Sequence, residues 1–404
     1  MIISLSKDRI KERITAEMLF FIAFIDRLVI AGWASTMFPS VPILNKVALL
    51  LFVLAIGIKV VFYDSYSLNE IVAYSVVTAL IGLQTVKSGY NIPFTILLLI
   101  IGARGVDFKK ILQIYITVVG SIVLFATICS LLGVIDNLRY WQENTESYRN
   151  SFGILHCTDY SSHMFFLFLA YFYLRNKKLR ILEYLYFTLF AALVFMATKG
   201  KLDFICMLAM ILIFAVGNLT QKEFFGKKFR RIWQVMWKIV GPLSMPLGVA
   251  IMFVMTFAYS EDNGFLNTLD NIITNRLMFG QKAINQSGLS LFGKSLEFVG
   301  NGGTEVVPSK DEYNFPDCSF VYVMLCYGIV ILAVIVFAHI LACINQGNDI
   351  YLMYAIALVS LNCMISHHLL DISYNPFILC LVATAIPKGI KLNDKSKIQY
   401  SLNT

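Results

Sequence analysis

The amino-acid sequence predicts an all-α polytopic membrane protein with about twelve membrane-spanning helices and one long external loop. Of the 404 residues, 58% are hydrophobic and only 14% are charged, and the mean hydropathy is +0.72. This composition excludes a soluble globular protein. The apolar runs are long and lack strict alternation, which favours helices over a β-barrel.

Apolar segments that are long enough to cross about 30 Å of hydrocarbon follow one another along most of the chain. The first follows a basic start and lacks a small-residue cleavage site, so we expect a retained helix. The fourth is short, and Pro93 near its start indicates a tilted or broken helix. The predicted spans are 16–37, 41–62, 69–86, 90–104, 110–134, 152–174, 181–198, 202–219, 236–258, 319–342, 349–366 and 371–388.

Lysine and arginine are distributed unevenly between the two sides of this topology. With the N-terminus inside, 22 of the 33 basic residues fall in inside segments or at the inner ends of spans, 9 fall outside and 2 lie elsewhere within spans. Because cytoplasmic loops carry the excess of positive charge, both termini are predicted to be cytoplasmic. The net charge of +8 then reflects topology and contact with anionic lipid headgroups, and nucleic-acid binding is not expected.

The chain is expected to form a single integral membrane domain, 1–404, with a polar external insert at 259–318 between spans nine and ten. Such a long insert is more typical of a membrane enzyme than of a channel or carrier. Apolar residues at roughly helical spacing predict an amphipathic helix over 267–286, ended by Gly288, which can lie flat on the membrane surface. The glycine-rich stretch at 291–303 favours a mobile flap and does not match a P-loop.

Four of the basic side chains predicted on the outer side of the membrane are candidates for binding a ligand. Arg149 ends the first external loop, Lys199 and Lys201 occupy a tight outer turn, and Arg276 lies on the predicted amphipathic helix. Each could be a solvated charge or a side chain that reaches for lipid phosphates. Together they favour an anion-binding site, in which arginine grips a phosphate through two bonds and lysine acts as a point charge.

Candidate acid–base groups occur at three places on the same side. His156, Asp159 and His163 have the spacing of one helical face, which fits a structural network, a polar cavity wall or a metal site. No second ligand cluster supports a metal, so none is expected. Asp317 lies just ahead of the tenth span, where it is either a general base or a carboxylate that stabilises the helix start.

The third place is the outer turn that carries His367, His368 and Asp371. A histidine–aspartate pair suits proton transfer, and a hydrogen-bonded structural turn is the alternative. In the first span, Asp26 and Arg27 are adjacent, so we expect each to meet another helix rather than its neighbour. The eight cysteines show no CxxC spacing and are interpreted as apolar packing residues, with no disulfide predicted.

Three short segments carry a family resemblance. They are RNSFGILHCTDYSSH, the pair NRLMFGQKAI and LFGKS, and DCSFVYVMLCYGIVIL, which contains Asp317, Ser319 and Gly328. With the arrangement of spans and the late external loop, the chain resembles the bacterial polysaccharide polymerases of the Wzy type, which are related to the O-antigen ligases. The outer turn departs from the family, because it reads Thr-Lys-Gly-Lys where Ser-Arg is frequent, and a lysine keeps the charge without the two-bond grip. His156 is followed by Cys-Thr-Asp where relatives often have Pro-Asn, so Asp159 is carried over only weakly.

The resemblance implies a GT-C-like membrane glycosyltransferase of the bacterial cytoplasmic membrane. It would join oligosaccharide repeat units carried on undecaprenyl pyrophosphate into capsular, O-antigen or exopolysaccharide chains on the outer face, without a nucleotide, metal or other cofactor. A flippase and a chain-length regulator would be its partners, besides membrane lipids. It assigns Arg149 and Arg276 to the pyrophosphate, with Lys199 or Lys201 assisting and Asp159 lining the site. The base would be Asp317, His156, His367 or His368.

Two other functions remain open at this point. An O-antigen-type ligase would transfer a finished glycan to a different acceptor with the same donor chemistry. A transporter or flippase of the pathway would move the lipid-linked sugar without forming a bond. Twelve-span carriers often have two six-span halves joined by a longer central cytoplasmic loop, whereas here the central segment RNKKLR is short and the major loop is external and late. The sequence therefore favours the polymerase.

Overall fold

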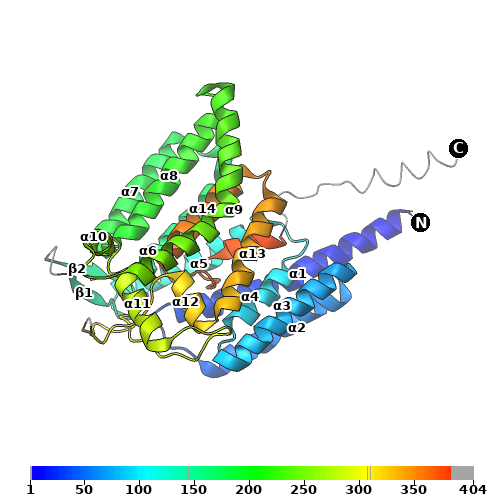
Figure 1. The fold of residues 1–404 in the computed structure, drawn as a ribbon. Helices are drawn as coiled ribbons and strands as arrows, with labels where there is room; N and C mark the ends of the chain where they lie inside the picture. Colours follow the sequence, from blue (N-terminus) through cyan, green and yellow to red (C-terminus); the bar gives the residue numbers. More distant parts are fainter. Residues whose placement is uncertain (1, 143–145, 307, 310, 384–404) are drawn as a thin grey trace.

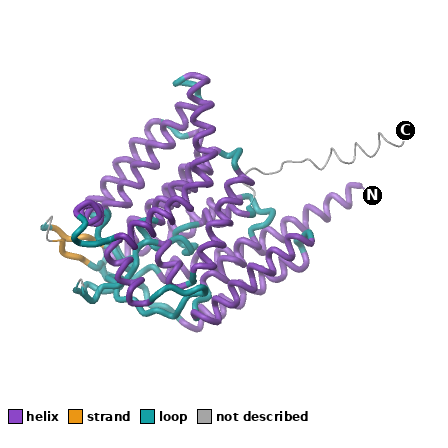
Figure 2. The backbone as a smooth tube through the Cα atoms, in the orientation of Figure 1, coloured by secondary structure: helices purple, strands orange, loops and turns teal. Residues whose placement is uncertain are grey.

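The computed structural model describes residues 2–142, 146–306, 308–309 and 311–383, with side chains from residue 12 onward. It is a bundle of helices with one short β-hairpin (Figures 1 and 2). In chain order the elements are α1 (Ile2–Ala34), α2 (Pro42–Phe62), α3 (Leu68–Ser88), α4 (Ile92–Gly102), α5 (Phe108–Leu131), β1 (Arg139–Gln142), β2 (Ser147–Asn150), α6 (Cys157–Arg175), η2 (Asn176–Lys178), α7 (Ile181–Thr198), α8 (Lys201–Gln221), α9 (Gly226–Ala258), α10 (Gly264–Ile272), α11 (Arg276–Ser287), α12 (Ser319–Cys326), α13 (Ile329–Gln346), α14 (Ile350–Cys363) and η3 (Pro376–Leu381).

Among the described residues, seven helices are long and apolar enough to cross a membrane, namely α2, α3, α5, α7, α8, α9 and α13. Their outward faces carry large exposed apolar side chains such as Leu50, Leu185 and Leu212, as expected for surfaces in contact with lipid. The chain is therefore an all-α multi-pass membrane protein. The predicted fourth span is α4, an apolar helix of 11 residues, and Pro93 lies in its first turn.

Two of the predicted spans are wrong in form. The tenth, 319–342, is broken at Tyr327 and Gly328 into α12 and α13, because Gly328 adopts a φ of +96° that a helix cannot contain. The twelfth, 371–388, is not an α-helix over its described part. Residues 371–375 form turns, Pro376–Leu381 form the 3₁₀ helix η3, and residues 384–388 lie outside the described residues.

The amphipathic helix predicted over 267–286 is two helices, α10 and α11. Thr274 and Asn275 both adopt left-handed backbone conformations, with φ of 60° and 62°, and this interrupts the helix. Gly288 ends α11 as expected. The apolar side of α11 does not face lipid, since Leu277 and Ile284 are buried against the bundle.

The expectation that Asp26 and Arg27 do not contact each other is also wrong. The Arg27 Nε donates to Asp26 Oδ2 at 2.7 Å, and its Nη2 lies 2.6 Å from the same oxygen. The long arginine side chain folds back along α1, and its guanidinium also lies over the Phe52 ring at 5.1 Å. Side-chain length thus overcomes the divergence of adjacent helical positions.

The polar segments gather at one end of the bundle. Short connections join α1 to α2 and α7 to α8, so consecutive helices run in opposite directions and their ends alternate. The β1–β2 hairpin, the α7–α8 turn, α10, α11 and the loop that follows α11 lie together at one end (Figure 1). The turn after α14 joins them, because Ser319 at the start of α12 donates its backbone N–H to the Ser366 carbonyl at 3.0 Å.

Candidate functional site

A cavity of about 560 Å³, here called the basic cavity, opens at this polar end. Its lining comes from the hairpin, the start of α6, the α7–α8 turn, the start of α11, the loop before α12 and the turn after α14. The sequence-predicted residues that line it are Arg149, His156, Asp159, Lys199, Lys201, Arg276, Asp317 and His367. The structure therefore brings together eight of the nine residues to which the resemblance assigned a role. The ninth, His368, lies with Asp371 in an adjoining cavity.

The β-hairpin and the end of α7 position Arg149. In the antiparallel pairing of β1 and β2, Arg149 lies opposite Tyr140. The Arg149 Nε donates to the carbonyl oxygen of Thr198 at 3.0 Å, which is one of the last carbonyls of α7 and lacks a helical partner. One edge of the guanidinium is held by the backbone in this way, and the side chain is directed along the cavity wall.

The Lys199–Gly200–Lys201 turn fits closely against α6. Lys199 ends α7 with a φ of +52°, and Lys201 begins α8. A Cβ atom on Gly200 would lie 2.2 Å from the Ser161 hydroxyl oxygen, so a larger residue would require the Ser161 side chain to shift. Thr198 and Ser161 hydroxyls are hydrogen-bonded at 3.0 Å in the same contact. This packing fixes both lysines at the rim of the cavity.

Arg276 is held at the break between α10 and α11. Its Nε donates to the Ile365 carbonyl at 2.6 Å and its Nη1 to the Ile273 carbonyl at 2.7 Å. Asp270 caps α11 by accepting the backbone N–H of Leu277 at 2.7 Å. The arginine is only 9% exposed and lines the cavity. The helix break that the sequence did not predict is thus what places Arg276 in the site.

None of the four cavity cations has a carboxylate oxygen within 4.0 Å in the part of the chain that the structure describes. Elsewhere such pairs are frequent. Examples are Lys59–Asp64 at 2.7 Å, Arg104–Glu70 at 2.6 Å and Arg230–Glu223 at 2.7 Å. The cavity is also lined by the carboxylates of Asp159, Asp203 and Asp317. The four cations outnumber these carboxylates and form no ion pair with them, so their charge is available to a ligand. Such a site favours an anion with several oxygens, and pyrophosphate has that chemistry.

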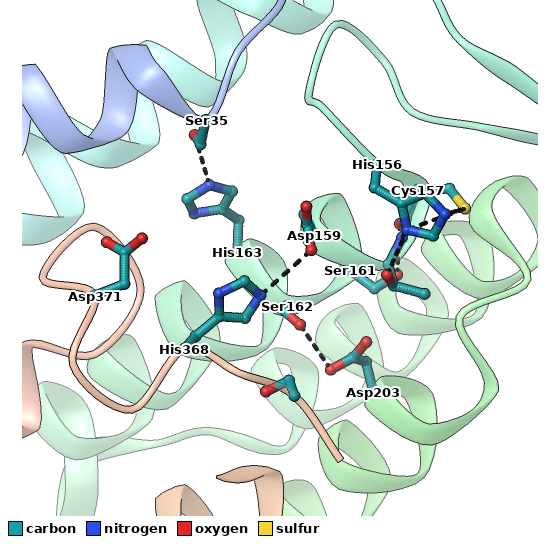
Figure 3. A network of polar contacts seen from close by, with 12 residues as sticks. Ser35, His156, Cys157, Asp159, Ser161, Ser162, His163, Asp203, His368 and Asp371 are labelled. Atoms are coloured by element: carbon teal, nitrogen blue, oxygen red, sulfur yellow. Dashed lines mark hydrogen bonds and ion pairs between the residues drawn. The ribbon is translucent and has the colours of Figure 1, made fainter. Parts of the chain in front are cut away.

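Neutral imidazoles lie beside these cations. Burial lowers the pKa of His156 to about 4 and the pKa of His367 to about 4. At neutral pH each ring is uncharged and has one nitrogen with a free electron pair. In His156 this nitrogen is Nδ1, which accepts the Thr158 backbone N–H at 3.3 Å and so caps α6. His163 does not share this position. It is fully buried, its Nε2 lies 3.0 Å from the Ser35 hydroxyl, and its ring stacks on Tyr374, so it belongs to a structural network (Figure 3).

Asp317 and Tyr313 line the side of the cavity that is nearest α12. Burial, with the Asp317 carboxylate nearby, raises the pKa of Tyr313, so this hydroxyl stays protonated and can donate a hydrogen bond. Two residues after Asp317, Ser319 accepts the Leu369 backbone N–H at 3.2 Å and donates to the Ser366 carbonyl. The Asp-x-Ser segment therefore fixes the turn that carries His367.

The loop between α11 and α12 covers part of the cavity. Gly293 and Gly328 allow close backbone contact, since a Cβ on Gly293 would lie 2.1 Å from the Cys326 carbonyl oxygen and one on Gly328 would lie 2.3 Å from the Leu291 carbonyl oxygen. Gly303 donates its N–H to the Leu155 carbonyl at 2.8 Å. Of the glycines that suggested a flap, Gly293 thus serves close packing and Gly303 makes a backbone hydrogen bond.

Asp159, His367 and His368 form the one cluster among the described residues whose ligand atoms would suit a metal ion, with all three within 4.8 Å of one another. The His368 Nε2 lies 3.4 Å from Asp159 Oδ1, and Figure 3 shows both side chains. Two histidines and a carboxylate are ligands typical of zinc and of other divalent transition metals. Burial lowers the pKa of His368 to about 3, so the imidazole is neutral.

Sequence reasoning missed Asp203. This carboxylate is 5% exposed, lines the cavity and accepts hydrogen bonds from the Ser162 hydroxyl at 3.1 Å and the Asn362 amide at 3.1 Å. The signal was available, because a carboxylate two residues after Lys201 falls inside an apolar span, where ionisable groups are costly. Asp203 ties α6, α8 and α14 together beneath the basic turn.

Comparison of the chain with protein-family models, with curated proteins and with solved structures finds no match.

Proposed function

We propose that the protein is a membrane glycosyltransferase that polymerises oligosaccharide repeat units carried on undecaprenyl pyrophosphate. The observation that carries the proposal is the convergence of Arg149, Lys199, Lys201 and Arg276 on one cavity, without carboxylate partners among the described residues. A lipid pyrophosphate supplies the anionic oxygens that these cations lack, and its isoprenoid chain fits an apolar bundle surface.

In the proposed reaction, a sugar hydroxyl of one repeat unit attacks the anomeric carbon of another. A new carbon–oxygen bond forms, the bond from that carbon to the pyrophosphate oxygen breaks, and lipid pyrophosphate leaves. The cations stabilise the charge that develops on the leaving group, and fixed charges of this kind act where water is excluded. Direct in-line attack inverts the anomeric centre.

The hydroxyl proton goes to a base within the cavity. His367, His156, Asp159 and Asp317 line it, and the two imidazoles are neutral because burial lowers the pKa of each to about 4. Arg149 and Arg276 are each held by backbone carbonyls, at 3.0 Å and 2.6 Å, so their positions do not have to form when the substrate binds. None of these roles requires a nucleotide or a metal.

The proposal includes location and sidedness. The protein would lie in a bacterial cytoplasmic membrane with both termini cytoplasmic and the basic cavity on the outer face, where a flippase delivers lipid-linked units. Seven candidate spanning helices and the charge asymmetry of the sequence support this arrangement.

Deletion of the gene distinguishes a polymerase from a ligase. A strain without a polymerase should show single repeat units on the lipid carrier or at the cell surface, whereas a strain without a ligase should accumulate long chains on the carrier. We expect single units, restored to polymer by the wild-type gene. Long carrier-bound chains in the deletion strain would overturn the assignment in favour of the ligase.

A further inference from the structure

A second cavity of about 520 Å³ adjoins the basic cavity. It is enclosed by α1, α2, α4, α12 and the turn 367–374. Leu155, Asp159 and His367 line both cavities, so these three residues form the shared wall. Groups that reach the wall from its two sides are therefore neighbours.

The two cavities differ in charge. Four cations without a carboxylate partner line the basic cavity within the described chain. Among the described residues that line the second cavity, Arg27 is the one lysine or arginine, and it is already paired with Asp26 at 2.6 Å. The carboxylates of Asp159 and Asp371 line the second cavity, whereas in the basic cavity four cations outnumber the carboxylates of Asp159, Asp203 and Asp317. A phosphate is thus favoured on one side of the wall and an uncharged polar ligand on the other.

The second cavity offers the groups that bind hydroxyls. Asn45 and Asn91 lie exposed at the outer ends of α2 and α4, Thr95 follows one turn along α4, and Tyr322 of α12 also lines the space. Amides and hydroxyls both donate and accept hydrogen bonds, and a tyrosine ring provides an apolar face beside a polar group. This combination suits a sugar.

His368 has a ring nitrogen without a protein partner among the described residues. It is 2% exposed and lines the second cavity; its Nε2 lies 3.4 Å from Asp159 Oδ1, whereas its Nδ1 has no hydrogen-bond partner in the described chain. Its ring is stacked on Tyr374 with centroids 3.6 Å apart, which fixes its plane. Buried polar atoms normally have partners, so a hydroxyl brought by a ligand is a fitting one.

We propose that the second cavity is the acceptor site, which takes the hydroxyl-bearing end of an uncharged sugar from a second lipid-linked repeat unit. This assignment rests on the proposed function. The acceptor hydroxyl lies at the wall, its oxygen forms the bond to the anomeric carbon held on the other side, and its proton passes to His367 or Asp159. The bond from the anomeric carbon to the pyrophosphate oxygen breaks, and the pyrophosphate departs into the basic cavity.

The test uses two probes on purified protein in lipid nanodiscs. One is undecaprenyl pyrophosphate without sugar, and the other is the repeat-unit oligosaccharide released from its carrier by mild acid. Thr95→Trp fills the second cavity, and we expect it to weaken oligosaccharide binding about 10-fold or more while undecaprenyl pyrophosphate binds within about twofold of wild type. Arg276→Ala should show the reverse pattern.

Thr117→Trp is the matched control. Thr117 is exposed on α5, outside both cavities, and its hydroxyl donates to the carbonyl four residues earlier, as that of Thr95 does. We expect this variant to bind both probes like wild type. Retained undecaprenyl pyrophosphate binding shows that Thr95→Trp is folded.

Polymer formation from lipid-linked repeat units tests the acceptor site separately from the proposed function. Wild-type protein that polymerises, together with a Thr95→Trp protein that does not, supports the acceptor site. If both proteins polymerise at the same rate, the acceptor site is wrong while the proposed function stands. If wild-type protein forms no polymer, the proposed function is wrong, and a reciprocal loss of the two probes then supports only a sugar-binding cavity. Unchanged oligosaccharide binding by Thr95→Trp overturns the site.

Discussion

The two ends of the helical bundle treat charge in opposite ways. At the end that carries the α2–α3, α4–α5, α6–α7 and α8–α9 connections, here called the paired end, several basic side chains are paired with carboxylates, as in Lys59–Asp64, Arg175–Glu183 and Arg230–Glu223. At the other end, four cations line a cavity and none is paired within the described chain. Paired charges stabilise a fold locally, whereas unpaired and converging charges are costly unless a ligand completes them. The difference is the basis of the proposal that the second end binds an anion.

The largest effect on activity is expected from Arg276. Arg276→Ala removes the most buried of the four cavity cations, and polymer formation should fall by about 100-fold or more because stabilisation of the leaving group is lost. The measurement is polymer formed per molecule of purified protein. Arg230→Ala, at the paired end, is the matched control and should stay within about twofold of wild type. An equal loss of polymer formation in the two variants would contradict the proposed difference between the two ends of the bundle.

At the paired end, removal of a counter-charge should lower the stability of the protein. Lys59 is 1% exposed and donates to both carboxylate oxygens of Asp64. Asp64→Asn leaves this buried ammonium without its counter-charge, so the free energy of unfolding should fall by about 3–5 kcal/mol. Thermal unfolding in detergent measures the change.

Glu223→Gln is the comparison for that stability effect. The Arg230–Glu223 pair is more than a third exposed on both sides, so the loss should not exceed about 1 kcal/mol. Activity per folded molecule should be unchanged in both variants. A large loss of activity in folded Asp64→Asn protein would show that the paired end contributes to the reaction.

A smaller effect is expected for the two lysines of the outer turn. The double change Lys199→Gln and Lys201→Gln removes two point charges at the cavity rim, and KM for the lipid-linked unit should rise about 10-fold. Lys177 and Lys178 are exposed at the other end of the bundle, and their double change to glutamine is the control. If KM rose in the control alone, the anion site would lie at the opposite end of the bundle and the proposal would be wrong.

The histidines predict a pH dependence. Burial holds the pKa of His156 and of His367 at about 4, below the ordinary value of 6.5. Each imidazole therefore stays neutral and able to accept a proton down to about pH 5. The rate should be level above that pH and fall as the pH passes through about 4. A fall centred near pH 6.5 would show that the reacting histidine is solvated.

The smallest effect is expected from metal removal. The proposed reaction needs no ion, so the polymerisation rate after treatment with a chelator should stay within about twofold of the untreated rate. Asp159, His367 and His368 are the described residues that could hold a metal. If chelation stops the reaction and zinc or manganese restores it, this cluster is a metal centre and the base must be assigned again.

The sequence was sufficient to predict a helical multi-pass protein and eight of the residues that line the basic cavity. Composition alone predicts helices in a membrane, and the alternation of spans predicts which loops share a side. Arg149, Lys199 and Arg276 could therefore be grouped without knowing any contact. The structure adds that they line the same cavity.

Local backbone and side-chain geometry could not be predicted in the same way. The break at Thr274 and Asn275 depends on left-handed conformations that periodicity does not reveal. The Asp26–Arg27 pair depends on a rotamer, and His163 lies on the predicted helical face yet packs away from the cavity against Tyr374. Hydropathy also cannot separate a spanning helix from the buried turns at 371–375, because both are rich in apolar residues.

The most direct test of the central claim is reconstitution of the purified protein in liposomes with lipid-linked repeat units and no ion gradient. We predict that wild-type protein forms polymer and releases one undecaprenyl pyrophosphate for each bond formed, and that Arg276→Ala protein does neither at a measurable rate. Translocation of the units without bond formation, or polymer of full length from Arg276→Ala protein, would contradict the account.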